Sequence, residues 1–82
     1  TGWMRAAALA QGAGIEMSSH LFAEASAQLL PVTPTAHWLE YVDWADPVLA
    51  EPLRIDKGFV MPSLRPGLGM AWNEKAVKKY LV

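Results

Sequence analysis

Two titratable side chains are spaced so that they could carry out acid–base chemistry together. His20 follows a short apolar stretch, Ile15–Met17, and Glu40 follows another, Ala36–Leu39. A free imidazole titrates near pH 6.5, roughly, and can therefore take up or release a proton at neutral pH. A carboxyl group beside it can act as a second acid or base, as an orienting group, or as a hydrogen-bond donor to an anionic substrate. This pair is the candidate catalytic site.

The elements around this pair must bring it together in space. Both apolar stretches are predicted to be short strands, and the segment between them, Phe22–Leu30, has apolar residues at helical spacing until Pro31 and Pro34 end it. A strand–helix–strand order favours a parallel sheet covered by helices. The C-terminal ends of parallel neighbours lie side by side, about 4.8 Å apart, at the rim where (β/α) barrels and open α/β sheets bind ligands. The pattern thus predicts that His20 and Glu40 are neighbours.

Local signals predict the flanking elements. Trp3–Ala13 is rich in helix-forming residues, and Gly14 comes directly after it, where a left-handed cap is expected. Lys57-Gly58 is a two-residue hairpin turn between the predicted strands Leu53–Asp56 and Phe59–Met61.

A last helix is predicted over Glu74–Tyr80. Asn73 can cap its start, Glu74 lies near its positive end, and Lys78 and Lys79 lie near its negative end.

The composition indicates a chain that lacks a core of its own. A chain of 82 residues buries only about 60 to 65% of its unfolded surface. It has no cysteine for a disulfide and no histidine cluster for a structural metal, yet 52% of its residues are apolar and four are Trp. We therefore expect that the rest of the core lies elsewhere, in a larger protein of which this chain is one part.

Charge and hydropathy exclude several classes of partner. The net charge is −1, and the basic residues are scattered apart from Lys75, Lys78 and Lys79, so no nucleic-acid partner is expected. The longest apolar run, Ala6–Ala10, is too short to span a bilayer, and the N-terminus has no signal-like core. We expect a soluble protein, and the absence of cysteine fits the cytoplasm.

Other polar residues carry weaker signals. Ser18 and Ser19 adjoin the histidine, but no third residue completes a nucleophilic triad. His37 alternates with Trp38 on a predicted strand, so it should face away from Trp38 and Glu40 as a structural residue. Three acidic residues lack a recognisable metal-ligand spacing and are expected to be solvated or capping charges: Asp43, Asp46 and Glu51.

Two motifs carry a resemblance to a known family. Met17–Phe22 reads MSSHLF, Thr33–Glu40 reads TPTAHWLE, and together they closely resemble the mandelate racemase family of the enolase superfamily. The resemblance extends over essentially the whole chain. It implies an N-terminal capping domain and a modified TIM barrel, of which this chain would be the last quarter with strands seven and eight. Residues 1–52 would then end the barrel, and residues 53–82 would be a C-terminal extension that packs back on the barrel and the capping domain.

The same resemblance assigns roles to residues. It implies that His20 is the acid/base for the proton alpha to a substrate carboxylate, and that Glu40 hydrogen-bonds this carboxylate as charge develops. Leu21 and Val42 flank the pair and would line the pocket for the substrate side chain. The Mg²⁺ of the complete enzyme would stabilise the enediolate, and its carboxylate ligands, a Lys-x-Lys motif and an Asp partner of the histidine would all lie upstream. We also expect the complete enzyme to be a homo-oligomer that acts on a small carboxylate.

Three functions remain open on the sequence. The first is a racemase-type isomerase of 2-hydroxy acids, and the second is an acid-sugar dehydratase of the same superfamily that starts with the same proton abstraction. The missing Lys-x-Lys motif would discriminate between them, because racemisation needs a second base on the opposite face of the carbon. The third is a stand-alone noncatalytic interaction module. Tyr41 occupies a position where the family has a basic residue, so we do not expect the substrate specificity to be identical.

Overall fold

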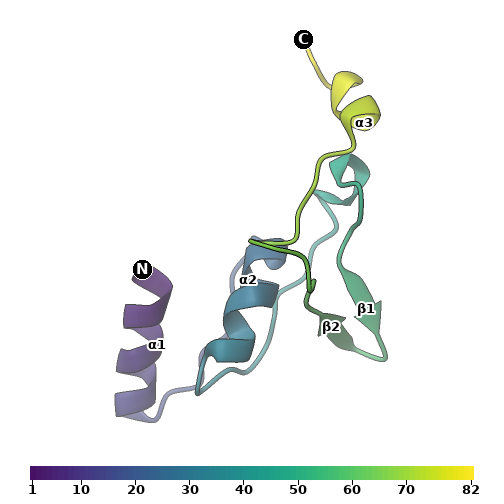
Figure 1. Ribbon diagram of the computed structural model, residues 1–82. Helices are drawn as coiled ribbons and strands as arrows, with labels where there is room; N and C mark the ends of the chain where they lie inside the picture. Colours follow the sequence, from purple (N-terminus) through teal and green to yellow (C-terminus); the bar gives the residue numbers. More distant parts are fainter.

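The computed structural model describes residues 1–82 and begins with helix α1, Gly2–Ala13 (Figure 1). The helix ends where the sequence predicts. Gly14 adopts a left-handed conformation with φ 65°, which most other residues avoid, and the N–H of Ile15 returns to the carbonyl of Ala10 at 2.9 Å. The predicted glycine cap is confirmed.

The second helix is shorter than predicted and changes type at its end. Helix α2 covers Ala23–Leu29 and continues as the 3₁₀ helix η1, Leu30–Val32. It starts one residue late because Phe22 has a left-handed φ of 46°. Pro31 ends only the α-helical part, since an early position of a 3₁₀ turn does not need the N–H that proline lacks.

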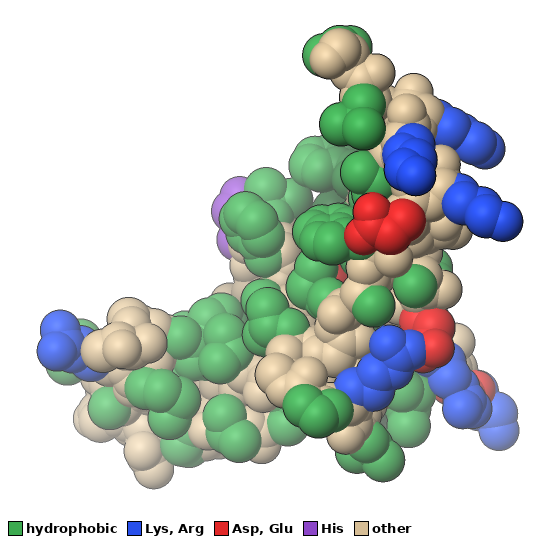
Figure 2. Space-filling view, turned by 45° about the horizontal axis from the view of Figure 1, so that its top comes forward, with side chains coloured by type: hydrophobic (Ala, Val, Ile, Leu, Met, Phe, Trp, Pro, Cys, Tyr) green, Lys and Arg blue, Asp and Glu red, His purple; other side chains and the backbone are tan.

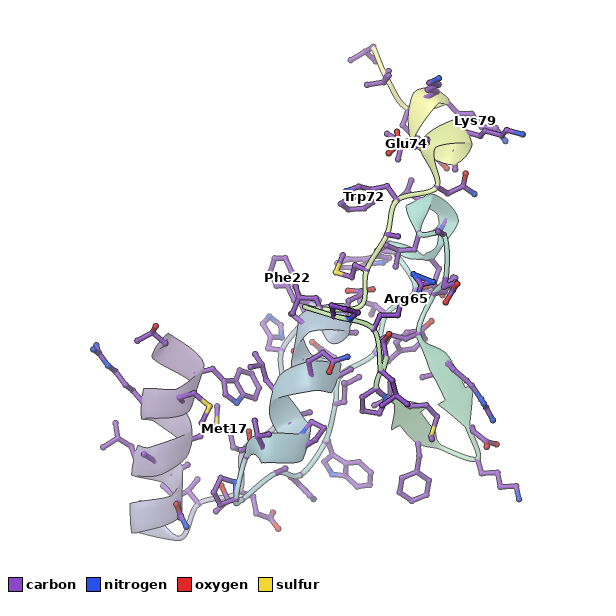
Figure 3. The ribbon with its side chains drawn as sticks, viewed as in Figure 1. Met17, Phe22, Arg65, Trp72, Glu74 and Lys79 are labelled. Atoms are coloured by element: carbon purple, nitrogen blue, oxygen red, sulfur yellow. The ribbon has the colours of Figure 1, made fainter.

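The two predicted strands around α2 are reduced to one parallel bridge, between Met17 and Ala36. The N–H of Met17 donates to the carbonyl of Thr35 at 2.8 Å, and the N–H of His37 donates to the carbonyl of Met17 at 3.0 Å. The predicted parallel direction is confirmed, but the length of the strands is not. Figure 3 shows Met17 between α1 and α2.

The predicted hairpin is confirmed. Strands β1, Arg54–Asp56, and β2, Phe59–Met61, pair antiparallel. Both turn residues have positive φ, 49° at Lys57 and 82° at Gly58, as a type I′ turn requires.

The last helix of the chain, α3, covers Glu74–Lys78 and contacts the 3₁₀ helix η2, Asp46–Val48. An antiparallel bridge joins Leu49 to Trp72 just before α3. The carboxamide of Asn73 accepts the N–H of Ala76 at 3.1 Å, so the predicted cap is confirmed, although α3 ends at Lys78 rather than Tyr80.

Few side chains are enclosed. Seven of 82 residues are buried, and they are mostly small, such as Ala7, Ala23 and Ala27. The radius of gyration is 14.5 Å, whereas a compact domain of this length would have about 12 Å. Figure 2 shows hydrophobic side chains spread over the visible face. Large apolar side chains are therefore exposed, including Phe22 at 79% and Trp44 at 75%.

The chain is an α/β structure with short helices and one small sheet. No helix in it is both long and apolar enough to cross a bilayer.

Candidate active site

The structure brings together the two residues that the sequence predicts to be neighbours. Nδ1 of His20 lies 3.0 Å from Oε2 of Glu40. Both side chains face solvent, with His20 84% and Glu40 44% exposed, so a ligand can reach them. Because Nδ1 contacts the carboxyl group, Nε2 is the ring nitrogen left for exchange of a proton with a ligand.

The backbone at Leu21 holds the carboxyl group from a second side. The N–H of Leu21 donates to the same Oε2 of Glu40 at 2.6 Å. Leu21 and Phe22 both have left-handed backbones, with φ of 53° and 46°. Consecutive non-glycine residues in this region are strained, and such strain is concentrated at functional sites. The turn after His20 thus directs a backbone donor at Glu40.

Two serines join the segments that carry the pair. The hydroxyl of Ser19 accepts the N–H of Glu40 at 2.9 Å, and the hydroxyl of Ser18 accepts the N–H of Trp38 at 3.2 Å. Sequence patterns offer no reason to assign these serines a structural role at the site, because hydroxyl-to-backbone bonds have no periodic signature.

Leu21 and Val42 line one pocket of about 250 Å³ together with Phe22, Glu24, Trp44 and Ala45. Five of these six residues are hydrophobic. Glu24 is the exception, and its Oε1 is buried without a hydrogen-bond partner. The lining of this pocket therefore suits an apolar group.

Sequence reasoning missed Phe22, Glu24 and Trp44 as lining residues. Phe22 and Glu24 lie in the stretch predicted as an amphipathic helix, where their types fit helix faces. Only their closeness to His20 in sequence could have indicated a role. Figure 3 shows Phe22 at the N-terminal end of α2.

Tyr41, directly after Glu40, is anchored in the adjoining loop. Its hydroxyl donates to Oδ2 of Asp46 at 2.6 Å. This hydrogen bond, with partial burial and the negative charges of Asp46, Asp43 and Glu24, raises the pKa of Tyr41 to about 12. Tyr41 is therefore a neutral donor at physiological pH.

His37 departs from the predicted alternation. Its ring lies 4.9 Å from that of Trp38, so the two are not on opposite faces of a regular strand. The reason is that regular pairing stops after His37, as only Met17 and Ala36 form a bridge. Nδ1 of His37 lies 3.5 Å from Oε2 of Glu16. The ion-pair partner of His37 is therefore Glu16 rather than Glu40.

The acidic residues do not form a metal centre. No group of three potential His, Cys, Asp or Glu ligands occurs in the structure. Asp46 accepts the Tyr41 hydroxyl, and Glu51 pairs with Arg65, whose guanidinium lowers the pKa of that carboxyl. The acidic residues present thus do not fit a metal site.

An α/β segment with a parallel bridge and a histidine–glutamate pair just beyond it is typical of enzymes that build their sites at strand ends. The family described as "Enolase C-terminal domain-like" matches residues 1–76. The chain belongs to this family of the enolase superfamily.

Known proteins of this superfamily resemble the chain over its whole length. A D-gluconate dehydratase of Thermoproteus tenax is 35% identical over 98% of the chain. A solved enolase from Bradyrhizobium, complexed with magnesium and mandelic acid, is 56% identical over 99% of the chain with a TM-score of 0.91. A solved L-talarate dehydratase from Polaromonas, complexed with Mg and L-glucarate, is 27% identical over 93% of the chain with a TM-score of 0.82. The chain spans only about a fifth of these proteins, between 18 and 22% of their length.

Proposed function

We propose that this chain supplies one acid/base, His20, and one carboxyl donor, Glu40, to a racemase-type isomerase of 2-hydroxy acids. The observation that carries the proposal is the 3.0 Å contact between Nδ1 of His20 and Oε2 of Glu40. Leu21 and Val42, which share the neighbouring pocket, are proposed to contact the substrate side chain.

The contacts of His20 and Glu40 indicate which atoms of the two side chains are available to the substrate. Oε2 of Glu40 is engaged by the Leu21 N–H and by His20, which leaves Oε1 to donate to the substrate carboxylate when it is protonated. Nε2 of His20 takes the proton on the carbon next to that carboxylate, and the electron pair of the C–H bond moves into the carboxyl group. The hydrogen bond from Glu40 strengthens as this charge grows, which is differential stabilisation of the transition state. Return of a proton to the carbon completes the exchange.

The pocket favours an apolar substituent on the substrate. An aromatic or aliphatic group there would lose contact with water against Leu21, Val42 and Trp44. The Bradyrhizobium relative, at 56% identity, was solved with mandelic acid. We therefore propose a 2-hydroxy acid with an apolar side chain.

An acid-sugar dehydratase is the second candidate. The relatives from Thermoproteus tenax and Polaromonas carry dehydratase names, and abstraction of the same proton would begin an elimination of water. Glu24 is the one charged residue among the six that line the neighbouring pocket, and it gives this candidate a specific support, because a carboxylate can accept hydrogen bonds from sugar hydroxyls.

For the complete protein we propose a (β/α) barrel that ends with residues 1–52, and an extension, residues 53–82, that packs on the barrel and a capping domain. The parallel bridge and a mostly apolar cavity of about 490 Å³ between η1, the segment after Ala36 and the hairpin support this arrangement. The Mg²⁺ of the complete enzyme would be held by residues outside this chain. A homo-oligomer in the cytoplasm remains our expectation.

The proposal is tested by incubating the complete protein in D₂O with each enantiomer of mandelate and, separately, with gluconate. Proton NMR monitors loss of the alpha proton, and polarimetry monitors racemisation. The racemase predicts deuterium in mandelate with loss of optical rotation. Formation of a 2-keto product from gluconate, with mandelate unchanged, would establish the dehydratase instead.

A further inference from the structure

The hydrogen bonds between the two parallel segments shift by one residue just before the catalytic pair. In a regular parallel ladder the N–H of Ser19 would donate to the carbonyl of His37, two residues beyond the one that Met17 uses. It donates instead to the carbonyl of Trp38 at 2.9 Å. The segment that ends at Glu40 therefore contains one extra residue relative to its neighbour, as in a β-bulge.

Serine hydroxyls take the place of backbone acceptors where the ladder is broken. The Ser18 hydroxyl accepts the N–H of Trp38 at 3.2 Å, and the Ser19 hydroxyl accepts the N–H of Glu40 at 2.9 Å. A backbone N–H without an acceptor is unfavourable, so these hydroxyls stabilise the shifted register. Because a shift of one residue reverses which face a side chain occupies, the register decides where Glu40 points.

We propose that Ser19, supported by Ser18, is a positioning residue that holds Glu40 in contact with His20. The inference rests on the proposed function, since it assigns Ser19 a role through the Glu40 carboxyl. Glu40 is then fixed at two points, its own N–H by the Ser19 hydroxyl and its Oε2 by the Leu21 N–H. Both serine hydroxyls act as acceptors of backbone N–H groups in this arrangement.

The test compares Ser19→Ala, which removes the acceptor, with Ser19→Thr, which keeps a hydroxyl, in the complete protein. We expect kcat of Ser19→Ala to fall about tenfold to a hundredfold with KM nearly unchanged, because a misplaced group slows the reacting step more than it weakens binding. Ser19→Thr should restore most of kcat. Ser18→Ala should have a smaller effect, since its bond is longer and more remote.

Ser63→Ala is the matched control. The Ser63 hydroxyl also accepts a backbone N–H, that of Arg65 at 3.2 Å, but in the loop after β2. Its kcat should equal that of the wild type. Equal losses in Ser19→Ala and Ser63→Ala, or the same loss in Ser19→Thr as in Ser19→Ala, would overturn the inference.

A double-mutant cycle separates this inference from the proposed function. If Ser19 acts through Glu40, Ser19→Ala should reduce kcat far less in a Glu40→Gln background than in the wild type. Fully additive losses would overturn the positioning role while leaving Glu40 catalytic. A Glu40→Gln enzyme with normal kcat would instead overturn the proposed function.

A variant that fails to fold does not end the test. If Ser19→Ala gives no cooperative thermal transition, Ser19→Cys replaces it, because a thiol of similar size is only a weak acceptor. The positioning role predicts a lower kcat for Ser19→Cys than for Ser19→Thr. Equal kcat values for these two variants would contradict it.

Discussion

The backbone N–H of Leu21 lies 2.6 Å from Oε2 of Glu40, and Leu21 makes this contact from a left-handed backbone with φ 53°. One residue thus has two roles, because its side chain also lines the pocket beside the pair. Residues in this backbone region carry a cost on the order of 1 to 3 kcal/mol that the surrounding structure must offset. Pocket shape and carboxyl orientation are consequently coupled at Leu21.

Glu40→Gln tests the carboxyl donor. Glutamine keeps a donor of similar shape but is a far weaker acid, so we expect kcat to fall by about 10² to 10⁴, or roughly 3 to 5 kcal/mol of transition-state stabilisation, with little change in KM. Steady-state kinetics of the complete enzyme measures this. Glu16→Gln, which alters only the exposed contact with His37, is the matched control and should behave as wild type. A folded Glu40→Gln variant with near-normal kcat would remove Glu40 from the site.

His20→Asn tests the one-sided acid/base. Because a histidine reaches only one face of the substrate carbon, the variant should lose exchange of the alpha proton from one enantiomer and retain it from the other. Proton NMR of each enantiomer in D₂O measures this directly. His37→Asn changes the chain's other histidine and should leave both exchanges intact. Equal loss from both enantiomers in His20→Asn would argue against the one-face role.

The bond between Tyr41 and Asp46 makes a prediction about alkaline pH. The pKa of Tyr41 is raised from 10.0 to about 12 in the folded protein, so its contribution to stability is fully present below pH 10 and is lost as pH rises toward 12. At pH 11, the difference in absorbance at 295 nm between wild type and Tyr41→Phe should show Tyr41 still protonated. Asp46→Asn should move the pKa back toward 10. An ionised Tyr41 at pH 11 in the folded wild type would refute the raised value.

The exposed apolar surface predicts how the isolated chain behaves. With seven buried residues and 52% apolar composition, residues 1–82 alone should be aggregated or molten and should bind ANS. Fluorescence titration with ANS and circular dichroism during heating would measure this. A monomer with a cooperative thermal transition and no ANS binding would instead favour a stand-alone module.

Features set by a few adjacent residues were predicted from the sequence. Gly14 at a helix end, Lys57-Gly58 in a hairpin turn and Asn73 at a helix start each impose a local backbone geometry, and all three occur as predicted. The nearness of His20 and Glu40 was predictable as well, because a parallel connection fixes which strand ends meet.

Features that depend on contacts across the chain were not predicted. The bulge at His37 and Trp38 depends on hydroxyl acceptors from Ser18 and Ser19. Hydrogen bonds from a backbone N–H to a serine hydroxyl follow no periodic pattern in the sequence. The left-handed Phe22 is a second case, since a bulky side chain normally avoids that backbone region and nothing next to it predicts the exception.

The parallel bridge between Met17 and Ala36 closes a loop that contains His20 and α2, and Glu40 follows that closure in the chain. The number of residues in this loop therefore affects the relative position of His20 and Glu40. Each residue added to or removed from a helix rotates the chain beyond it by about 100° and moves it by about 1.5 Å. A single deletion within residues 23–29 should then separate His20 from Glu40 more effectively than most substitutions there, so we expect the length of this connection to be constrained more tightly than its composition.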